Sequence, residues 1–172
     1  GIAAARGGWI LTMDCDFIHL LPELRDFFDR AAAGERFVVG SRFSRASVLI
    51  NYPFPKIVAN RAFHVLVNLL LRFRVRDVTN NLKLARREVL REIDLVSPGF
   101  SVNAETGLKP ILRGHWPCEV PISWINRTLE MGQSHFRVVA VGPGYLGVLR
   151  DVARQARGRR LRRPRGGSFP GD

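Results

Sequence analysis

The sequence predicts an α/β domain with a mostly parallel sheet flanked by helices, and two observations support this class. A short apolar strand pattern at residues 9–13 is followed by a helical pattern at 22–33 and by a second strand pattern at 37–39. This strand–helix–strand order favours two parallel strands joined by a right-handed crossover. The hydrophobic fraction of 46% over 172 residues is enough for one packed core.

The helix at 22–33 has Pro22 near its start and Gly34 just after its end, the usual positions of these residue types. Residues 43–55 contain two prolines and are predicted to form a loop. Four apolar side chains are predicted to share the buried face of the helix: Leu24, Phe27, Phe28 and Ala31.

A long helix is predicted at residues 56–74. Its polar side chains recur every four positions and form a slowly winding stripe on an otherwise apolar helix: Lys56, Asn60, His64, Asn68 and Arg72. Two interpretations stay open. Either the helix packs on the core with one hydrated edge, or it lies at a membrane interface where its Lys and Arg reach the head groups.

The middle of the chain is predicted to consist of short elements. Residues 77–81 are typical of a turn, 82–86 alternate like an edge strand, and 87–94 form a short helix. A further helix is predicted at 103–113, although Gly107 and Pro110 weaken the pattern.

The last predicted elements are a strand and a helix. The strand spans residues 118–125, and Pro121 within it favours an edge position because proline cannot donate to a neighbouring strand. A Gly-Pro-Gly sequence at 142–144 is predicted to break the chain, and an amphipathic helix follows at 145–157.

The basic charge is concentrated at the end of the chain. The formal net charge is +12; residues 150–172 hold eight Arg and two Asp, a net of 8 − 2 = +6, and 12 − 6 leaves +6 for the rest. The composition predicts a basic disordered tail at 158–172 after a folded domain at 1–157. A basic tail favours a lipid leaflet or nucleic acid. Because aromatic residues do not alternate with the arginines, we expect an anionic membrane surface and no nucleic-acid partner.

Signals for the compartment are sparse. No window approaches the roughly 20 apolar residues needed to span a bilayer, and nothing near Gly1 resembles a signal peptide. Cys15 and Cys118 lack the spacing of a metal site or a disulfide framework, which favours a reducing compartment. We therefore expect a cytoplasmic protein that is peripheral to the inner face of the membrane. The chain begins without Met and enters a strand almost at once, so we also expect further sequence upstream.

Two carboxylates follow the first predicted strand directly, at Asp14 and Asp16. The carboxyl ends of strands are where open α/β sheets bind ligands. Carboxylates two residues apart can both reach one Mg²⁺ or Mn²⁺ ion, which prefers oxygen ligands and shares them with a diphosphate. Solvated loop carboxylates are the alternative interpretation. His19 is either a third ligand or phosphate donor, or an ordinary residue at the start of a helix.

A second polar group contains arginines that suit a phosphate. Arg61 and Arg76 carry planar guanidinium groups, which make paired charge-assisted hydrogen bonds to phosphate oxygens. Ordinary surface arginines are the alternative in a chain this rich in Arg. Glu105 lies on a helix poor in charge, so it either faces a cleft or is a plain surface residue. No Ser, Cys or His occurs in a recognisable triad setting.

Five segments match the motifs of one known family, and they follow one another along the chain in the same order as in that family. They are residues 10–17 with Asp-x-Asp, His19 with Pro22-Glu23, Val39-Gly-Ser-Arg-Phe43, residues 75–79 with 86–90, and residues 119–122 with Arg127, Gly132 and Ser134. Together they cover residues 1–137. The chain resembles the family 2 glycosyltransferases, close to the dolichyl- and polyprenyl-phosphate sugar synthases.

The resemblance implies a partial GT-A fold, the nucleotide-diphospho-sugar transferase fold. It implies that Asp14 and Asp16 hold a Mg²⁺ or Mn²⁺ ion and, with His19, the diphosphate of a nucleotide diphosphate sugar. The first strands of the family lie upstream of Asp14, where this chain has only residues 1–8. This again leads us to expect upstream sequence.

On the acceptor side, the resemblance implies that Arg76, with Arg61 and Lys56, binds the phosphate of a polyprenyl phosphate lipid. Asp77 and Glu105 are the expected orienting groups at the reacting centre. The implied reaction is inverting transfer of a hexose, as in cell envelope biosynthesis. Other acceptors such as a polysaccharide, an inactive chain, and a basic membrane-binding module stay open as alternatives.

Three positions depart from the pattern of the family. Two residues after the second Asp, where the family often has a polar residue, this chain has Ile18. The acceptor segment of the family has Thr-Ser-Gly, and this chain has Thr-Asn-Asn at 79–81. After the late Gly-x-Ser, the family has Lys or Arg and this chain has His135. These differences leave the acceptor open.

Overall fold

The structure, a computed structural model, describes residues 1–14, 23–125 and 138–157. Asp16, His19, the family-like residues at 127–135 and the predicted tail at 158–172 lie outside the described residues. What the sequence predicts for them stays a prediction.

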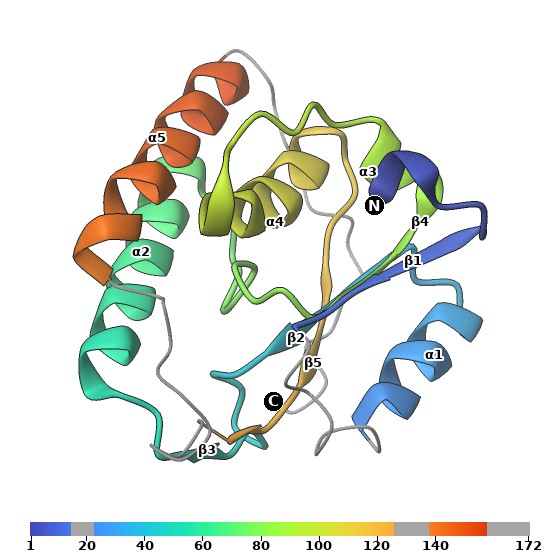
Figure 1. Cartoon of the computed structure of the whole chain (residues 1–172), viewed down its shortest axis with the longest axis horizontal. Helices are drawn as coiled ribbons and strands as arrows, with labels where there is room; N and C mark the ends of the chain where they lie inside the picture. The colour runs from blue at the N-terminus through green and yellow to red at the C-terminus, as the bar shows by residue number, and fades with distance from the viewer. Residues whose placement is uncertain (15–22, 126–137, 158–172) are drawn as a thin grey trace.

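A mixed four-stranded sheet lies at the centre of the fold, with its strands in the order β1-β4-β2-β5 (Figure 1). β4 runs antiparallel to both β1 and β2, whereas β2 and β5 are parallel. Three strands therefore point one way and β4 points against them. The strands are β1 (Trp9–Thr12), β2 (Phe37–Ser41), β4 (Lys83–Arg86) and β5 (Cys118–Pro121).

The predicted α/β class is confirmed, but the predicted pairing of the first two strands is wrong. β4 lies between them and is central, where the sequence predicts an edge strand. Ala85 of β4 pairs with Ile10 on one side and with Phe37 on the other. Leu84 and Ala85 are both buried, on opposite faces of the sheet, as a central strand requires. β5 with Pro121 does lie at the edge, as predicted.

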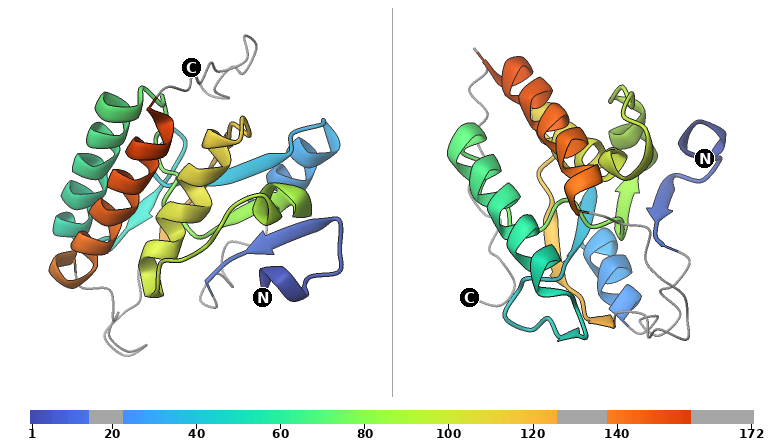
Figure 2. Two further views of the ribbon diagram at one scale, coloured as in Figure 1. Left: turned by 90° about the horizontal axis from the view of Figure 1, so that it is seen from above. Right: turned by 60° about the vertical axis from the view of Figure 1, so that its left-hand side comes forward.

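Helices cover both faces of the sheet. α1 packs on one face, α3 and α4 lie on the other, and α2 and α5 lie side by side beyond α4 (Figures 1 and 2). The helical segments are η1 (Ile2–Ala4), α1 (Leu24–Ala32), α2 (Phe54–Leu71), α3 (Arg87–Arg91), η3 (Gly99–Ser101), α4 (Val102–Leu112) and α5 (Val138–Ala156).

The structure differs from the sequence prediction in three segments: the loop at 43–55, the strand at 118–125 and the chain break at 142–144. The predicted loop at 43–55 contains β3 (Leu49–Ile50), which pairs in parallel with β6 (Trp124–Ile125). The single strand predicted at 118–125 is therefore two strands, β5 and β6, in different sheets. The predicted break at 142–144 is also wrong, because α5 runs through it. At Gly144 a Cβ would lie 3.1 Å from Ser101 Cβ, so this glycine allows α5 to pack close to η3.

The hydrophobic core has three parts. One lies between α1 and the sheet and contains Phe27 and Leu84. A second lies between the sheet, η1 and α3 and contains Phe37 and Ala85. The third holds α2, α4 and α5 together. Phe27 is fully buried in the first part as predicted, but Phe28, predicted for the same face, is 53% exposed because the helix turns it outward.

Apart from Arg72, which follows the end of α2 and is exposed, the polar stripe faces the protein, which neither interpretation of the sequence predicts. Asn68 Nδ2 donates to Val75 O at 3.0 Å, and Asn68 Oδ1 accepts from Val75 N at 3.1 Å. His64 Nε2 accepts from Val78 N at 3.0 Å. Asn60 Nδ2 donates to Asp77 Oδ1 at 3.1 Å. The stripe therefore binds the irregular segment 75–79 and satisfies its backbone groups, which a buried loop needs.

The opposite side of α2 is apolar and exposed. We call the following residues the outer stripe: Phe54, Val58, Val65, Leu66, Leu69 and Leu70. They recur at helical spacing along the helix, so α2 exposes an apolar face in addition to the apolar residues that it buries in the core, Phe63, Val67 and Leu71. No helix in the described part of the chain is both long and apolar enough to span a bilayer.

Gly107 is required by the packing of α4 against the segment 75–79. A Cβ at this position would lie 2.0 Å from the carbonyl oxygen of Val78. The helix is nevertheless formed at Val102–Leu112, close to the predicted bounds. The glycine that weakens the helix in the sequence is thus the residue that allows α4 to reach the backbone beside Asp77.

Candidate functional site

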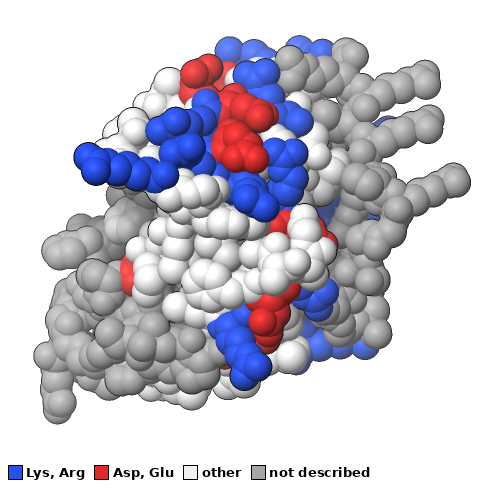
Figure 3. Space-filling model, turned by 90° about the vertical axis from the view of Figure 1, so that its right-hand side faces the viewer, with Lys and Arg blue, Asp and Glu red and all other residues white. Residues whose placement is uncertain are grey.

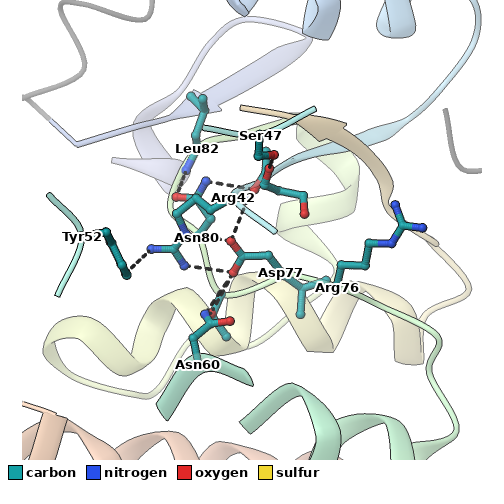
Figure 4. A network of polar contacts seen from close by, with 12 residues as sticks. Arg42, Ser47, Tyr52, Asn60, Arg76, Asp77, Asn80 and Leu82 are labelled. Atoms are coloured by element: carbon teal, nitrogen blue, oxygen red, sulfur yellow. Dashed lines mark hydrogen bonds and ion pairs between the residues drawn. The ribbon is translucent and has the colours of Figure 1, made fainter. Parts of the chain in front are cut away.

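A buried ion pair between Arg42 and Asp77 forms the centre of the site (Figure 4). Arg42 follows β2 and Asp77 lies in the segment that α2 and α4 hold in place. Arg42 Nε donates to Asp77 Oδ2 at 2.7 Å, and Arg42 Nη2 donates to Asp77 Oδ1 at 2.9 Å. The backbone N–H of Arg42 adds a third bond to Oδ2 at 3.0 Å. This bidentate arrangement fixes the plane of the guanidinium group.

Asp77 has the surroundings of a carboxylate that stays ionised. It is fully buried and also accepts hydrogen bonds from Asn60 at 3.1 Å and Thr79 at 3.4 Å. Burial alone would raise its pKa, but the charge and hydrogen bonds of Arg42 outweigh this and lower the pKa of Asp77 to about 2. Asp77 therefore holds Arg42 and is the orienting group of the pair.

Aromatic rings surround the guanidinium group of Arg42. Its carbon lies 5.8 Å from the ring centre of Phe43, 5.7 Å from Tyr52 and 5.6 Å from Trp124. Nη1 also donates to Tyr52 Oη at 3.0 Å. Side-chain bonds to described residues thus use three of the five guanidinium N–H groups. Among the described residues, one N–H on each terminal nitrogen has no side-chain partner.

Two further cations predicted for the acceptor phosphate gather next to Arg42. Arg61 stacks on Phe43 with 4.5 Å between its guanidinium carbon and the ring centre, and Nη2 donates to Arg76 O at 2.7 Å. Burial lowers the pKa of Lys56, and the positive charge of Arg42 lowers it further. Lys56 and Arg61 therefore share one side of the site with Arg42.

Arg76 is placed differently from the other predicted phosphate ligands. Its side chain points away from the Arg42–Asp77 pair (Figure 4). Its backbone N–H donates to both carboxylate oxygens of Glu119, at 2.9 and 3.1 Å, and Asp77 N donates to Glu119 Oε1 at 2.7 Å. Glu119 thus fixes the backbone of this segment, and the phosphate-binding role of Arg76 stays a prediction.

Asp14 marks the other end of the site, just beyond β1. Asn81 Nδ2 donates to Asp14 Oδ1 at 2.8 Å, and Thr12 Oγ1 donates to Asn81 O at 2.6 Å. These bonds hold the carboxylate at the carboxyl end of β1, next to the end of the segment that carries Asp77. In the described residues no three His, Cys, Asp or Glu side chains cluster as a metal site would require. Asp16, the second predicted ligand, lies outside them.

Glu105 does not face a cleft. Oε1 accepts from Lys109 Nζ at 2.6 Å, while Oε2 accepts from Val96 N at 3.1 Å and Ser97 N at 2.9 Å. Its contacts hold the loop before α4, and its predicted role as an orienting group at the reacting centre stays a prediction.

Two buried bases lie close to this site. His64 Nδ1 is 2.8 Å from Asn60 O while Nε2 accepts from Val78 N, so the neutral tautomer carries its proton on Nδ1. Burial lowers the pKa of His64 to about 4. Burial also lowers the pKa of Lys83, a residue of β4, to about 7.

The face that carries α3 and α1 mixes both signs of charge (Figure 3). Arg36 pairs with Glu88 at 3.0 Å, and Arg25 lies 3.8 Å from Asp29. Basic and acidic side chains alternate over this face, so its described residues do not form the uniform basic patch that a nucleic-acid-binding module would need.

Comparison with known proteins identifies the family. The family described as "Glycosyl transferase family 2" matches residues 1–94, more than half of the chain. This chain belongs to glycosyl transferase family 2. Its fold agrees with that of a solved structure, glucosyl-3-phosphoglycerate synthase from Mycobacterium tuberculosis in complex with UDP. The TM-score is 0.57 at 16% identity, over 90% of this chain and 52% of that one. The predicted GT-A-like fold is thereby confirmed.

Curated relatives of this family 2 protein are between 26% and 30% identical to it over the aligned residues. It is 29% identical to "Polyprenol monophosphomannose synthase" of Mycolicibacterium smegmatis, over 72% of the chain and 48% of that protein. It is 30% identical to "Dolichyl-phosphate hexose transferase" of Haloferax volcanii, over 70% and 52%. "Undecaprenyl-phosphate mannosyltransferase" of Micrococcus luteus is 26% identical, over 82% and 58%. The chain spans about half the length of these relatives.

Sequence reasoning missed Arg42, Tyr52 and Lys83 as site residues of this family 2 member. The signal for Arg42 was present, since a polar Gly-Ser-Arg sequence follows a buried strand at residues 40–42. Tyr52 and Lys83 gave no such signal. Tyr52 follows β3, and Lys83 lies in a pattern typical of an edge strand, where a lysine is expected to face water, whereas the central strand β4 buries it.

Proposed function

We propose that this protein is an inverting glycosyltransferase that moves a hexose from a nucleotide diphosphate sugar to a polyprenyl phosphate. One observation carries the proposal: Arg42, which follows β2, lies close to two cations of the first half of α2, Lys56 and Arg61, and α2 carries the exposed apolar outer stripe. A cationic site beside an apolar surface suits an amphiphilic anion, and a lipid phosphate is such a molecule. The printed names of the three relatives support the same acceptor class.

On the donor side, we assign the diphosphate to the carboxyl end of β1. The residues there fit a hard divalent cation, because Asp14 is a half-buried carboxylate held in place by Asn81 at 2.8 Å. Asp14 would hold the ion together with Asp16. When bound, Mg²⁺ or Mn²⁺ would neutralise charge on the departing nucleoside diphosphate.

The residues of the chain then mainly have to position the acceptor. Asp77 fixes the plane of Arg42, and the two unused N–H groups of Arg42, together with Arg61 and Lys56, orient the phosphate. A phosphate oxygen attacks the anomeric carbon from the face opposite the leaving group. The new C–O bond forms as the bond to the donor diphosphate breaks. Because the acceptor is already an anion at neutral pH, no strong general base is needed.

The outer stripe suits a peripheral position on an anionic leaflet, with the cytoplasmic face as the expected side. Its six residues would enter the boundary between head groups and acyl chains, as interfacial helices do. In that orientation the start of α2, where Lys56 lies, is close to the head-group level at which the phosphate of a polyprenyl lipid is found.

The test is a transfer assay with GDP-mannose and UDP-glucose as donors, each offered polyprenyl phosphate in vesicles or a lipid-free glycan. We expect a glycosylated lipid, formed only with Mn²⁺ or Mg²⁺, and lost with Asp16→Ala and with Arg42→Met. Arg25→Met, a change on the distant helix α1, is the matched control and should leave transfer intact. Turnover of the glycan alone would replace the lipid acceptor in this proposal. Unchanged turnover with chelator or with Asp16→Ala would remove the metal.

A further inference from the structure

A buried lysine that the proposed mechanism does not use is the first residue of the central strand β4. Lys83 is 1% exposed. Its ammonium group donates to Asn103 O and to Thr106 Oγ1, both at 2.9 Å, and both acceptors are neutral. No carboxylate among the described residues lies within ion-pair distance of its Nζ. A lysine is rarely buried without a charged partner, because the ammonium group loses its hydration.

A second buried lysine in the same protein has the ordinary arrangement. Lys109 Nζ lies 2.6 Å from Glu105 Oε1, so its charge is compensated inside the fold. The two lysines are similarly buried but differ in pairing. Lys109 thus serves the fold as half of an ion pair, whereas Lys83 pairs with no carboxylate in the part of the chain that the structure describes.

The strand register places Lys83 at the ligand-binding end of the sheet. It pairs with Thr12 on β1 and with Val39 on β2. Thr12 is the last residue of β1, and Asp14 follows two residues later. Side chains alternate between faces, so Lys83 lies on the α4 side of the sheet, opposite Leu84. Lys83 therefore lies at the end of the sheet where the chain leaves β1 and continues to Asp14.

A buried hydroxyl group on the same face also lacks a partner. Ser41 is fully buried, and its Oγ makes no hydrogen bond to any residue that the structure describes. It follows Val39 by two residues on β2, so its side chain lies on the same face as Lys83, diagonally across the sheet. A hydroxyl group and an ammonium group, both with unused donors, thus converge at one end of the sheet.

The charged groups near Lys83 point to an anion as the missing partner. Asp77 is already paired with Arg42 at 2.7 Å. Asp14 is the other carboxylate near Lys83 among the described residues, and it lies where the proposed function puts the donor diphosphate. We infer that Lys83 is the built-in counter-charge for an anionic ligand of the diphosphate class that binds beside Asp14. The inference rests on the proposed function for the identity of that ligand.

Lys83 is a positioning residue in this inference. Its ammonium group acts through the electrostatic potential, which is strong in a low-dielectric interior, and not through a bond to the ligand. Because no carboxylate among the described residues pairs with its charge, replacing it with methionine should remove an unfavourable burial along with the potential. Stability and anion affinity should then change in opposite directions, which a lysine with a purely structural role would not produce.

The experiment compares Lys83→Met with Lys109→Met. Binding of inorganic diphosphate, GDP and UDP, each with Mn²⁺, is measured by calorimetry, and the thermal midpoint is measured without ligand. For Lys83→Met we expect an affinity at least tenfold weaker with an unchanged or higher midpoint. For Lys109→Met we expect the reverse, a lower midpoint with unchanged affinity. Lys83→Gln keeps an N–H donor without the charge and decides the result if Lys83→Met does not fold.

Each other outcome has a defined meaning. A lower midpoint with wild-type affinity in both Lys83 variants would make Lys83 a structural residue, as would failure of both to fold. Absence of diphosphate binding by the wild-type protein would also overturn the inference. If inorganic diphosphate binding depends on Lys83 but GDP and UDP bind no more tightly than diphosphate, the inference stands and the nucleotide-sugar donor of the proposed function fails. If only Asp16→Ala weakens nucleotide binding, the donor stands and the inference fails.

Discussion

The side-chain amide of Asn68 binds both backbone groups of Val75: Nδ2 donates to the carbonyl oxygen at 3.0 Å, and Oδ1 accepts from the N–H at 3.1 Å. Asn68 thereby takes the place of a neighbouring strand for the segment that carries Asp77. The contact explains why α2 places polar side chains inward and leaves leucines outside.

Asn68→Leu should destabilise the protein by about 2–4 kcal/mol, because two buried backbone groups lose their partners. The adjacent change Leu69→Gln, on the exposed side of the same helix, should alter stability by less than about 0.5 kcal/mol. Chemical denaturation of both variants measures the contrast. Equal effects of the two changes would mean that the stripe does not support the 75–79 segment.

Asp77→Asn should be the most damaging single change in the site. Removing one partner of a buried ion pair typically costs about 3–5 kcal/mol, because the other charge stays buried. The exposed pair Arg36–Glu88 is the matched control, and Glu88→Gln should have little effect. Denaturant midpoints give the stability of each variant, and a transfer assay gives the loss of activity. A stable but inactive Asp77→Asn variant would give Asp77 a direct role in the reaction and not only a role in holding Arg42.

Local signals predict much of this fold. The strand–helix–strand start, α4 and the edge position of Pro121 follow from hydrophobic periodicity and from the backbone restrictions of proline and glycine. The order of the sheet does not follow, because β4 enters between β1 and β2 from a point more than 40 residues after β2. Periodicity reports which residues are buried and says nothing of which strands are neighbours.

The inward-facing polar side chains of α2 show a second limit of sequence reasoning. A polar stripe on an apolar helix normally faces water, and the sequence contains no local sign that the segment 75–79 binds to it. The same holds for the site. Asp14 is marked by the strand before it, whereas Lys83 and Tyr52 gain their meaning only from partners distant in sequence: Thr106 for the lysine and Arg42 for the tyrosine.

Stability should fall with pH in a window set by His64. Burial lowers its pKa in the folded state to about 4, from 6.5 in the unfolded chain, so the unfolded state binds more protons between these values. The contribution of His64 is therefore fully present above pH 6.5 and is lost as the pH falls towards 4. The difference of 2.5 units corresponds to about 3 kcal/mol.

The measurement is the free energy of unfolding at several pH values for the wild type and for His64→Gln, which does not titrate. The difference between the two proteins should change steadily from pH 6.5 to 4 and then level off. Subtraction removes the contributions of other groups, including Asp77, whose pKa near 2 places its own loss at lower pH. A constant difference over the whole range would mean that His64 has the same pKa in the folded and in the unfolded protein, so that burial does not lower it.

The outer stripe should govern binding to lipid vesicles. Leu69 and Leu70 are 71% and 63% exposed near the end of α2, so replacing both with Glu leaves the core untouched. Each leucine that enters the acyl boundary contributes about 1.5–3 kcal/mol, so the double change should weaken binding to anionic vesicles by at least about tenfold. Phe28→Glu, an exposed apolar residue on α1, is the matched control and should leave binding intact.

Raising the salt concentration separates the two sources of affinity, because screening weakens the attraction of arginines but not the burial of leucines. Vesicle sedimentation at low and high salt measures both. Equal binding of the double variant and the wild type at high salt would exclude the outer stripe as the membrane contact.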